Sequence, residues 1–261
     1  MTEQGVKMKS ENARDFSLKG VFAVIGTLGL LTVVLIPAIT HAKRMADLRM
    51  VGAKGKDIFV AITIAETMCE PSVRVCLWPR TQIDEKENHD EVKILYIEKA
   101  FSDSTSYFYE LYDGEHLGQP EQWDPYVTGF DYSKLAGAGV PQMTGKLRPE
   151  NNMWCVAGNF RDETDDLIPV LVTRNVDCSS FRIKTQGNPG TPLRWSQQYS
   201  TPFGTEGWVM VRKGGAVFHG TAKDSVTGVA YPRGAGERPT DGNASLTSLV
   251  YLTPDGIACP Q

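Results

Sequence analysis

The stretch FSLKGVFAVIGTLGLLTVVLIPAI, residues 16–39, is a long apolar segment near the start of this sequence. Its part from Val21 to Ile39 contains nineteen residues without a formal charge. At about 1.5 Å per residue, a helix of that length spans roughly 28 Å, close to the hydrocarbon core of a bilayer. Few helices of soluble proteins stay apolar on every face. We therefore predict a transmembrane helix over residues 21–39.

The apolar pattern continues beyond Pro37 at the spacing of a helix. The apolar positions are Ile39, Ala42, Met45 or Ala46, Leu48, Val51, Ile58, Phe59, Ile62 and Ala65. We predict one long helix over residues 16–66, roughly 75 Å long if helical throughout, whose first half projects from the head. A cleaved secretory signal would have a shorter apolar run that ends at a small-x-small site. Basic residues flank the span on both sides, so their distribution does not choose its orientation.

The composition limits what the rest of the chain does. Its 261 residues accommodate a polar, leader-like prefix at 1–15, the long helix, and one head domain at 67–261. The net charge of −4 provides no basic field for nucleic acid. The 25 glycines and 15 prolines favour a loop-rich head that contains strands over a helical bundle.

Short apolar runs in the second half of the chain predict a sheet. The expected strands are residues 153–158, 168–174, 207–213, 215–220 and 248–252, with shorter runs at 73–78 and at 91–98, the latter either strand or helix. We expect Gly214 and Gly215 to form a two-residue hairpin turn. The stretch 106–113 predicts a short helix with Phe108, Leu111 and Tyr112 in the core, and residues 114–152 predict long surface loops. The fold class is therefore α+β, with the long helix packed on an antiparallel sheet.

Five cysteines occur at positions 69, 76, 155, 178 and 259, without a zinc-finger spacing. In a head outside the cytoplasm, we expect disulfides between Cys69 and Cys76 and between Cys155 and Cys178. Free buried thiols are the alternative, because sequence does not determine connectivity.

The N-terminal residues carry a resemblance to a known family. Phe16-Ser17-Leu18 opens the apolar run, Gly29 follows thirteen residues after Phe16, and Pro37 follows twenty-one residues after it. These spacings resemble the N-terminal segment of type IV pilins and type II secretion pseudopilins. The runs at 166–177 and 207–218 are looser points of likeness.

The resemblance implies a structural subunit of a helical filament, a type IV pilus or a type II secretion pseudopilus. It implies partners as well: copies of the same chain, the inner-membrane assembly machinery with its prepilin peptidase and N-terminal methylation, and membrane lipid before assembly. The head would lie in the periplasm before assembly, and the filament would be periplasmic or extracellular. Gly20, Gly29 and Pro37 would mark where the helix melts on assembly, because proline removes a hydrogen bond and glycine weakens a helix. An ordinary kinked anchor is the alternative.

Two positions depart from the family pattern. The residue before the expected cleavage site at Phe16 is Asp15, where the family has glycine. The fifth mature residue is Gly20, where most family members have a glutamate that pairs with a neighbouring N-terminus. The pseudopilin at the filament tip is similar in lacking that glutamate. A minor or tip subunit and an unprocessed anchor therefore stay open.

Chemical motifs are few. His41, His89, His116 and His219 are scattered, and no nucleophile elbow, phosphate loop or dinucleotide fingerprint occurs. We therefore expect no enzymatic activity and no cofactor. Asp162, Asp165 and Asp166 make up an acidic loop that offers oxygen ligands to calcium, but it lacks the glycine and the alternating spacing of a calcium loop. A solvated loop is the preferred interpretation.

Two other functions are kept in view. The chain is alternatively a membrane-anchored periplasmic binding module that stays monomeric, with a ligand held by the loops at 114–152. Trp123, Tyr126, Phe130 and Tyr132 would then form a stacking surface, although such aromatic residues more often attach a loop to its own domain. An enzyme is the third class, because residues of a spatial triad lie far apart in sequence.

Overall fold

The protein divides into two compact units, residues 1–45 and residues 46–261. The computed structural model describes residues 18–67, 73–81, 93–96, 100–113, 131–159, 166, 168–183, 194–221, 230–231 and 250–258. The described part of the first unit, residues 18–45, is the first half of one long helix. The second half of that helix belongs to the head unit.

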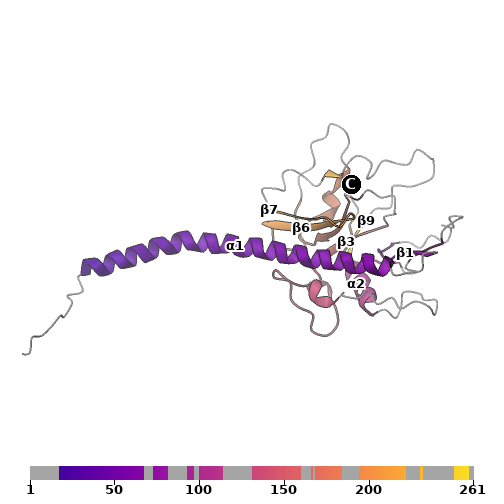
Figure 1. The fold of residues 1–261 in the computed structure, drawn as a ribbon, viewed down its shortest axis with the longest axis horizontal. Coiled ribbons are helices and arrows are strands. Elements are labelled where there is room, and N and C mark those ends of the chain that lie inside the picture. The colour runs from indigo at the N-terminus through magenta and orange to yellow at the C-terminus, as the bar shows by residue number, and fades with distance from the viewer. Residues whose placement is uncertain are drawn as a thin grey trace, which may run out of the picture. The chain divides into compact units, whose positions relative to one another are not determined.

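Helices and strands follow the order that the sequence predicts, with the long helix first and most strands last (Figure 1). The helices are α1 (Leu18–Thr67), α2 (Ser104–Asp113) and the 3-10 turns η1 (Tyr132–Lys134), η2 (Pro149–Asn151) and η3 (Cys178–Ser180). The strands are β1 (Val73–Cys76), β2 (Lys93–Tyr96), β3 (Trp154–Gly158), β4 (Pro169–Thr173), β5 (Arg182–Ile183), β6 (Gly207–Arg212), β7 (Val217–Thr221), β8 (Ala230–Tyr231), β9 (Val250–Thr253) and β10 (Gly256–Ala258).

The main sheet has six strands in the order β10-β9-β3-β4-β6-β7, and each neighbouring pair is antiparallel. The α+β class and the predicted strands of this sheet are confirmed, with ends shifted by one or two residues. β10 was not predicted. Two further pairs, β1 with β2 and β5 with β8, are parallel. The run at 91–98 is therefore a strand where the structure describes it.

Glycines bring α1 close to one face of the sheet. A Cβ on Gly55 would lie 2.7 Å from Cη2 of Trp154 and 2.9 Å from Cγ2 of Val211. A Cβ on Gly52 would lie 3.1 Å from Cγ1 of Val217. The helix thus packs on the sheet at a distance that any larger side chain at position 55 would increase. In Figure 1 the second half of α1 runs alongside β6 and β7.

The other face of the sheet is covered by the chain that follows β4. Every residue of β3 and β4 is buried, so both faces of the sheet centre are covered. Since strand neighbours point to opposite faces, Trp154 faces α1 and Cys155 faces away from it. Ala157 is on the Cys155 face with its cross-strand partner Tyr251, whose ring contacts Phe181 edge to face at 5.2 Å between centroids.

Helix α2 attaches to the sheet through side-chain hydrogen bonds to the backbone. Its N-cap residue Asp103 accepts from the backbone N–H of Ser106 at 2.7 Å. The Ser104 hydroxyl donates to the Trp154 carbonyl at 2.7 Å. Phe108 and Leu111 are buried, as predicted, whereas the side chain of Tyr112 lies outside the description.

The predicted two-residue turn at Gly214 and Gly215 is wrong. The N–H of Gly215 donates to the carbonyl of Arg212, and the N–H of Arg212 donates to the carbonyl of Ala216. These bonds enclose a three-residue loop, residues 213–215, that ends in a bulge at Gly215 with φ 76°. Glycine adopts this left-handed conformation at little cost, so Gly215 sets the length of the loop.

The prediction of surface loops at 114–152 needs a correction in the described part, residues 131–152. Apart from η1 and η2 this part is irregular, as expected, but it is not confined to the surface. Leu135, Ala136, Val140 and Leu147 are buried. The N–H of Met153 donates to the Leu135 carbonyl, which draws the loop into the core.

Candidate functional site

The first half of α1 presents apolar side chains on all sides. Every residue from 20 to 43 is exposed. The large apolar members are Val21, Phe22, Val24, Ile25, Leu28, Leu30, Leu31, Val33, Val34, Leu35, Ile36 and Ile39. Among the described residues α1 is the one helix long and apolar enough to cross a membrane, a test that a signal sequence also passes. Such a surface requires an apolar environment, either lipid or other helices.

Three threonine hydroxyls of this half are satisfied within the helix. The hydroxyls of Thr27, Thr32 and Thr40 donate to carbonyls one turn earlier, at 2.7–2.8 Å. These bonds suit a medium that lacks water, where each unpaired polar group is costly. Pro37 lies inside the helix and has no N–H for the carbonyl of Val33. The helix is therefore weakest around Pro37.

In the head unit, α1 has a second apolar face. Leu48, Val51, Ile58 and Ile62 of the predicted apolar pattern are fully buried, whereas Ile39 and Ala42 of the same pattern are exposed. The opposite side carries exposed residues that we name the outward stripe: Ala46, Met50, Ala53, Asp57, Val60, Ile64 and Thr67. Their spacing alternates between four and three residues, the repeat by which one helix packs against another. Met50 and Ile64 are 42% and 41% exposed.

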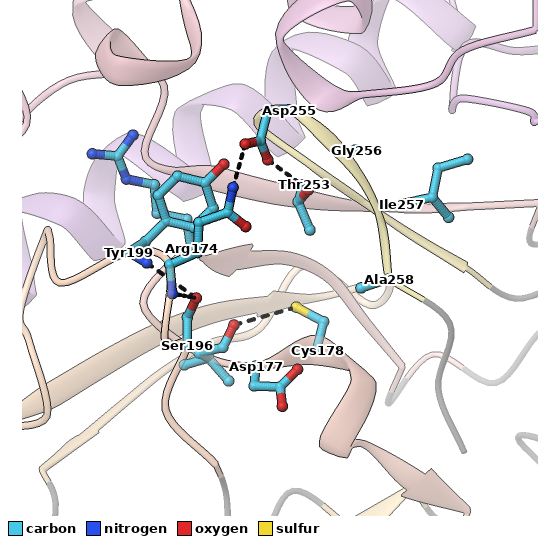
Figure 2. Close-up of a pocket in the computed structure, with 12 residues that line it drawn as sticks. Arg174, Asp177, Cys178, Ser196, Tyr199, Thr253, Asp255, Gly256, Ile257 and Ala258 are labelled. Atoms are coloured by element: carbon cyan, nitrogen blue, oxygen red, sulfur yellow. Dashed lines mark hydrogen bonds between the residues drawn. The ribbon is translucent and has the colours of Figure 1, made fainter.

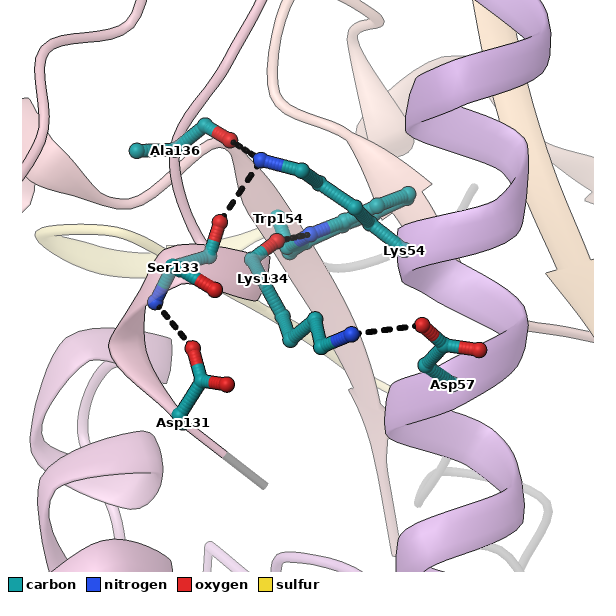
Figure 3. Close-up of polar contacts among 7 residues, drawn as sticks. All are labelled: Lys54, Asp57, Asp131, Ser133, Lys134, Ala136 and Trp154. Carbon is teal, nitrogen blue, oxygen red and sulfur yellow. Dashed lines mark hydrogen bonds and ion pairs between the residues drawn. The ribbon is translucent and has the colours of Figure 1, made fainter. Parts of the chain in front are cut away.

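A polar clamp on α1 holds the segment around η1 (Figure 3). The Lys54 ammonium donates to the carbonyls of Ser133 and Ala136, at 2.7 and 2.5 Å. The Lys134 ammonium pairs with the Asp57 carboxylate at 2.6 Å. The clamp thus fixes a loop to the helix next to the outward stripe.

Three groups at the clamp and at the neighbouring η1 cap have shifted pKa values. The hydrogen bond to Asp57 raises the pKa of Lys134. Hydrogen bonding from Ser133 lowers the pKa of Asp131, which caps η1. Burial lowers the pKa of Lys54, and the charge of Lys134 lowers it further. The shifts of Lys134 and Asp131 move both groups away from pH 7, so the clamp serves structure better than proton transfer.

A cavity of about 300 Å³ lies on the head (Figure 2). Its described lining is Arg174, Val176, Asp177, Cys178, Ser196, Gln198, Tyr199, Thr253, Asp255, Gly256, Ile257 and Ala258. Gln198 donates from its amide to the Asp255 carboxylate across one wall. The lining is mainly polar and comes from the end of β4, the segment before β6, and the β9–β10 hairpin.

Arg174 has a structural role in the wall of this cavity. It is 6% exposed, and its guanidinium donates to the carbonyls of Pro149, Glu150, Asn152 and Thr201. Burial lowers its pKa. Because the protein uses most of its N–H donors, Arg174 has little capacity left for a ligand.

Among its described lining residues, the cavity pairs no nucleophile with a histidine base. The Arg174 guanidinium lies 4.9 Å from the ring centroid of Tyr199. Burial raises the pKa of the Tyr199 phenol, and the neighbouring Asp255 carboxylate raises it further. No histidine is among the described lining residues. The phenol therefore stays protonated at neutral pH, and the described lining offers polar contacts for binding.

Some of the predicted site residues lie within the described parts of the chain, and others lie outside them. Gly20, Gly29 and Pro37 lie in α1, where a Cβ on either glycine would meet no atom within 4 Å. Asp15, Phe16, Asp162 and Asp165 lie outside the described residues, as do His89, His116, Trp123, Tyr126 and Phe130. His41 and His219 are exposed, and Tyr132 begins η1 half-buried.

Asp166 belonged to the predicted acidic loop. Its carboxylate lies 3.9 Å from the Lys213 ammonium, and its carbonyl accepts from the N–H of Gly214. Within the described ranges no three acidic, histidine or cysteine side chains cluster as metal ligands. Asp166 is thus tied to the β6–β7 loop, and the calcium prediction as a whole depends on residues outside the description.

The cysteines are distributed over three environments. Cys76 at the end of β1 is half-buried and a free thiol, while Cys69 and Cys259 lie outside the described residues. Cys155 and Cys178 are buried, and each is a free thiol in this structure. The two predicted disulfides therefore stay predictions.

Sequence reasoning missed the outward stripe, the close contact at Gly55 and the buried Arg174. The four-three spacing of the stripe is visible in the sequence, but it interleaves with the positions that face the sheet. Gly55 and Arg174 carry no comparable signal, because their neighbours come from distant parts of the chain.

No protein-family model, curated protein or solved structure matches this chain. The function proposed next rests on the residues and contacts described above.

Proposed function

We propose that this protein is a pilin-like structural subunit that assembles through α1 into a helical filament, a type IV pilus or a type II secretion pseudopilus. Before assembly, the subunit lies in the inner membrane with its head in the periplasm. Copies of the chain then join by a non-closing, heterologous contact. The assembly machinery and a prepilin peptidase are its further partners, and the subunit carries out no chemistry.

One observation carries this proposal beyond a simple anchor: the outward stripe. A membrane anchor needs about 20 apolar residues, and residues 21–39 already supply them. The exposed Met50, Val60 and Ile64 lie beyond that length, where a monomer would leave them in water. A neighbouring helix that packs on the stripe removes this cost.

The departures at Asp15 and Gly20 favour a particular place in the filament. Without a glutamate at position 20, the subunit forms no ion pair with the N-terminus of a neighbour. Such a subunit suits a minor or tip position, where one of its two axial neighbours is missing. Its leader is either cut before Phe16 or retained.

The test is electron microscopy of material sheared from cells, with mass spectrometry of the N-terminus of the subunit. The informative variants are Val60→Gln and Ile64→Gln, which place an amide in the stripe. The matched control is Arg49→Gln, an exposed position beside the stripe. We expect filaments that contain the subunit in the wild type and the control, and their loss in both stripe variants, with the near-UV circular dichroism of the head unchanged.

Two results would count against the proposal, and the N-terminus decides the fate of the leader. If the wild-type protein stays in the membrane fraction and no filament contains it, the chain is no filament subunit. If stripe variants assemble as well as the control, the stripe is no helix contact. An N-terminus at Phe16 would establish cleavage after Asp15, and a retained leader would assign residues 1–15 to the filament.

The cavity favours one second candidate, a monomeric binding module anchored by α1. Its volume of about 300 Å³ lies at the lower end of the range for small-molecule sites. Most N–H donors of Arg174 are already bonded to the protein, which indicates a structural role for the residues around the cavity. We therefore rank the binding module second. A detergent-solubilised monomer that gains thermal stability with a small polar ligand would favour it.

A further inference from the structure

Two buried thiols meet on the face of the sheet that lies opposite α1. Cys155 belongs to the central strand β3 and is 1% exposed, and Cys178 begins η3 and is 2% exposed. Cys178 lines a cavity together with Thr253 of β9, the strand that pairs with β3 next to Cys155, and the neighbouring Cys155 helps to raise the pKa of the Cys178 thiol. Two cysteines that lie on different elements are thus neighbours inside the core.

The backbone around Cys178 is held in place by independent contacts. The Asp177 carboxylate accepts from the N–H and the hydroxyl of Ser179, at 3.0 and 2.6 Å. The N–H of Asp177 donates to the Arg194 carbonyl at 2.9 Å. Phe181, three residues on, packs against Tyr251 on the same sheet face as Cys155. The meeting of the two thiols therefore follows from how this segment covers the sheet.

The surroundings exclude two other uses of the pair. Within the described residues, the two thiols join no cluster of three metal-ligating side chains. A catalytic cysteine needs a stabilised thiolate, whereas burial, together with the neighbouring Cys155, raises the pKa of the Cys178 thiol. A structural cross-link remains as the use that fits both sulfurs.

We propose that Cys155 and Cys178 form a disulfide bond as the head folds in an oxidising compartment, and that this bond ties η3 to the second face of the sheet. The inference rests on the proposed periplasmic position of the head. It makes the pair a site of covalent modification that stabilises the subunit.

The oxidant is the disulfide of a thiol–disulfide exchange protein. The thiolate of one cysteine attacks that disulfide, forms a mixed disulfide and releases one sulfur of the exchange protein as a thiolate. The thiolate of the second cysteine then attacks the first cysteine and releases the other sulfur. Two protons and two electrons pass from the cysteine pair to the exchange protein, which leaves as a dithiol.

The cavity in Figure 2 explains when the reaction takes place. Cys178 lines this cavity, but Cys155 does not, and the Cys178 thiol points to the carbonyl of Val176 at 3.8 Å. In the folded head both sulfurs are buried, and burial raises the pKa of the Cys178 thiol, which keeps it protonated at neutral pH. We therefore expect oxidation before the core closes and slow oxidation of folded, reduced protein.

The first experiment maps the bond in the full-length protein. Cells are quenched in acid, free thiols are alkylated, and peptides are analysed by mass spectrometry without reduction. We expect a linked pair of peptides that contain Cys155 and Cys178. A topology reporter fused to the head is measured in parallel, together with refolding of the detergent-solubilised chain in a glutathione redox buffer.

The outcomes separate this inference from the proposed function. A linked pair without filaments would leave the disulfide standing and refute the filament. Reduced cysteines in a cytoplasmic head that oxidise in the glutathione buffer would refute the periplasmic position and keep the pairing. Alkylated cysteines in an exported head, or no link in the glutathione buffer, would overturn the disulfide.

A stability measurement checks the mapped bond. We expect dithiothreitol to lower the urea midpoint of the wild type and of the Cys76→Ala control. Cys155→Ala, Cys178→Ala and the double variant are made in the Cys76→Ala background, which removes the predicted Cys69–Cys76 bond. They should share one lower midpoint that dithiothreitol does not change, because losing either sulfur breaks the same bond. The inference would be overturned if the losses in urea midpoint of the two single variants added up in the double variant, and if dithiothreitol still lowered the midpoint of each variant.

Discussion

Gly55→Ala is the substitution that most directly probes how α1 meets the sheet. The new Cβ would lie 2.7 Å from Cη2 of Trp154 and 2.9 Å from Cγ2 of Val211, both closer than real Cβ contacts allow. Trp154 is fully buried, so its ring has no free space to enter. Its indole N–H donates to the Lys134 carbonyl at 3.1 Å, and a displaced ring loses this bond.

The magnitude follows from three opposing effects. Overpacking of a core costs about 1–3 kcal/mol, and loss of the indole hydrogen bond costs about 1 kcal/mol. Replacing glycine by alanine in a helix returns about 1 kcal/mol. We therefore expect Gly55→Ala to lower the free energy of unfolding by about 1–3 kcal/mol. In a domain of this size each kcal/mol shifts Tm by about 2–4 °C.

The assay is urea unfolding of the full-length protein in mild detergent, followed by near-UV circular dichroism. Ala53→Gly on the outward stripe is the matched control, because its side chain is exposed and only helix propensity changes. The control should lose about 1 kcal/mol. If Gly55→Ala instead raises the unfolding midpoint, propensity outweighs packing and the close contact between α1 and the sheet is refuted.

Three further predictions concern the membrane span, the clamp and the buried cation. Leu30→Lys or Val33→Lys should impair membrane insertion, at about 2.5–3.5 kcal/mol, and normal membrane recovery and filament yield would contradict this. Lys134→Ala should cost only about 0.2–1 kcal/mol, because the pair with Asp57 is partly exposed. Since the folded pKa of Lys134 is raised, this contribution is present below its unfolded pKa near 10.4 and is lost as pH rises through the folded value, which urea midpoints at pH 7 and 11 test against Lys134→Ala. Arg174→Leu should lower the free energy of unfolding by about 1–3 kcal/mol, because it removes the guanidinium donor from the buried Asn152 carbonyl and from the part-buried Pro149 carbonyl, and a variant as stable as wild type would refute this role.

Much of the fold was predictable from local pattern. Residues 21–39 are apolar on every face of a helix, and that property does not depend on any other part of the chain. The strands at 154–158, 169–173 and 207–212 were found because short runs of β-branched and aromatic residues lie between turn residues. The length of the β6–β7 loop was not predicted correctly, because it depends on the register of the two strands and on the bulge at Gly215.

The candidate site was predictable only in part. The long apolar helix over residues 21–39 was visible in the sequence and is confirmed, whereas the weak points expected at Gly29 and Pro37 stay predictions. The helix beyond Ala46 carries two interleaved apolar patterns, and the sequence does not say which one meets the sheet. Burial decides this: Leu48, Val51, Ile58 and Ile62 face inward, and the outward stripe stays exposed.

By itself, the sequence determined the long apolar helix, the strand-rich second half and the α+β class, because these follow from the chemistry of neighbouring residues. Only the tertiary structure decided which helix face stays open, why position 55 must be small, and that the thiols of Cys155 and Cys178 lie together. The reason is physical. Each of these features is a contact between residues far apart along the chain, and such a contact exists only when the whole head has folded.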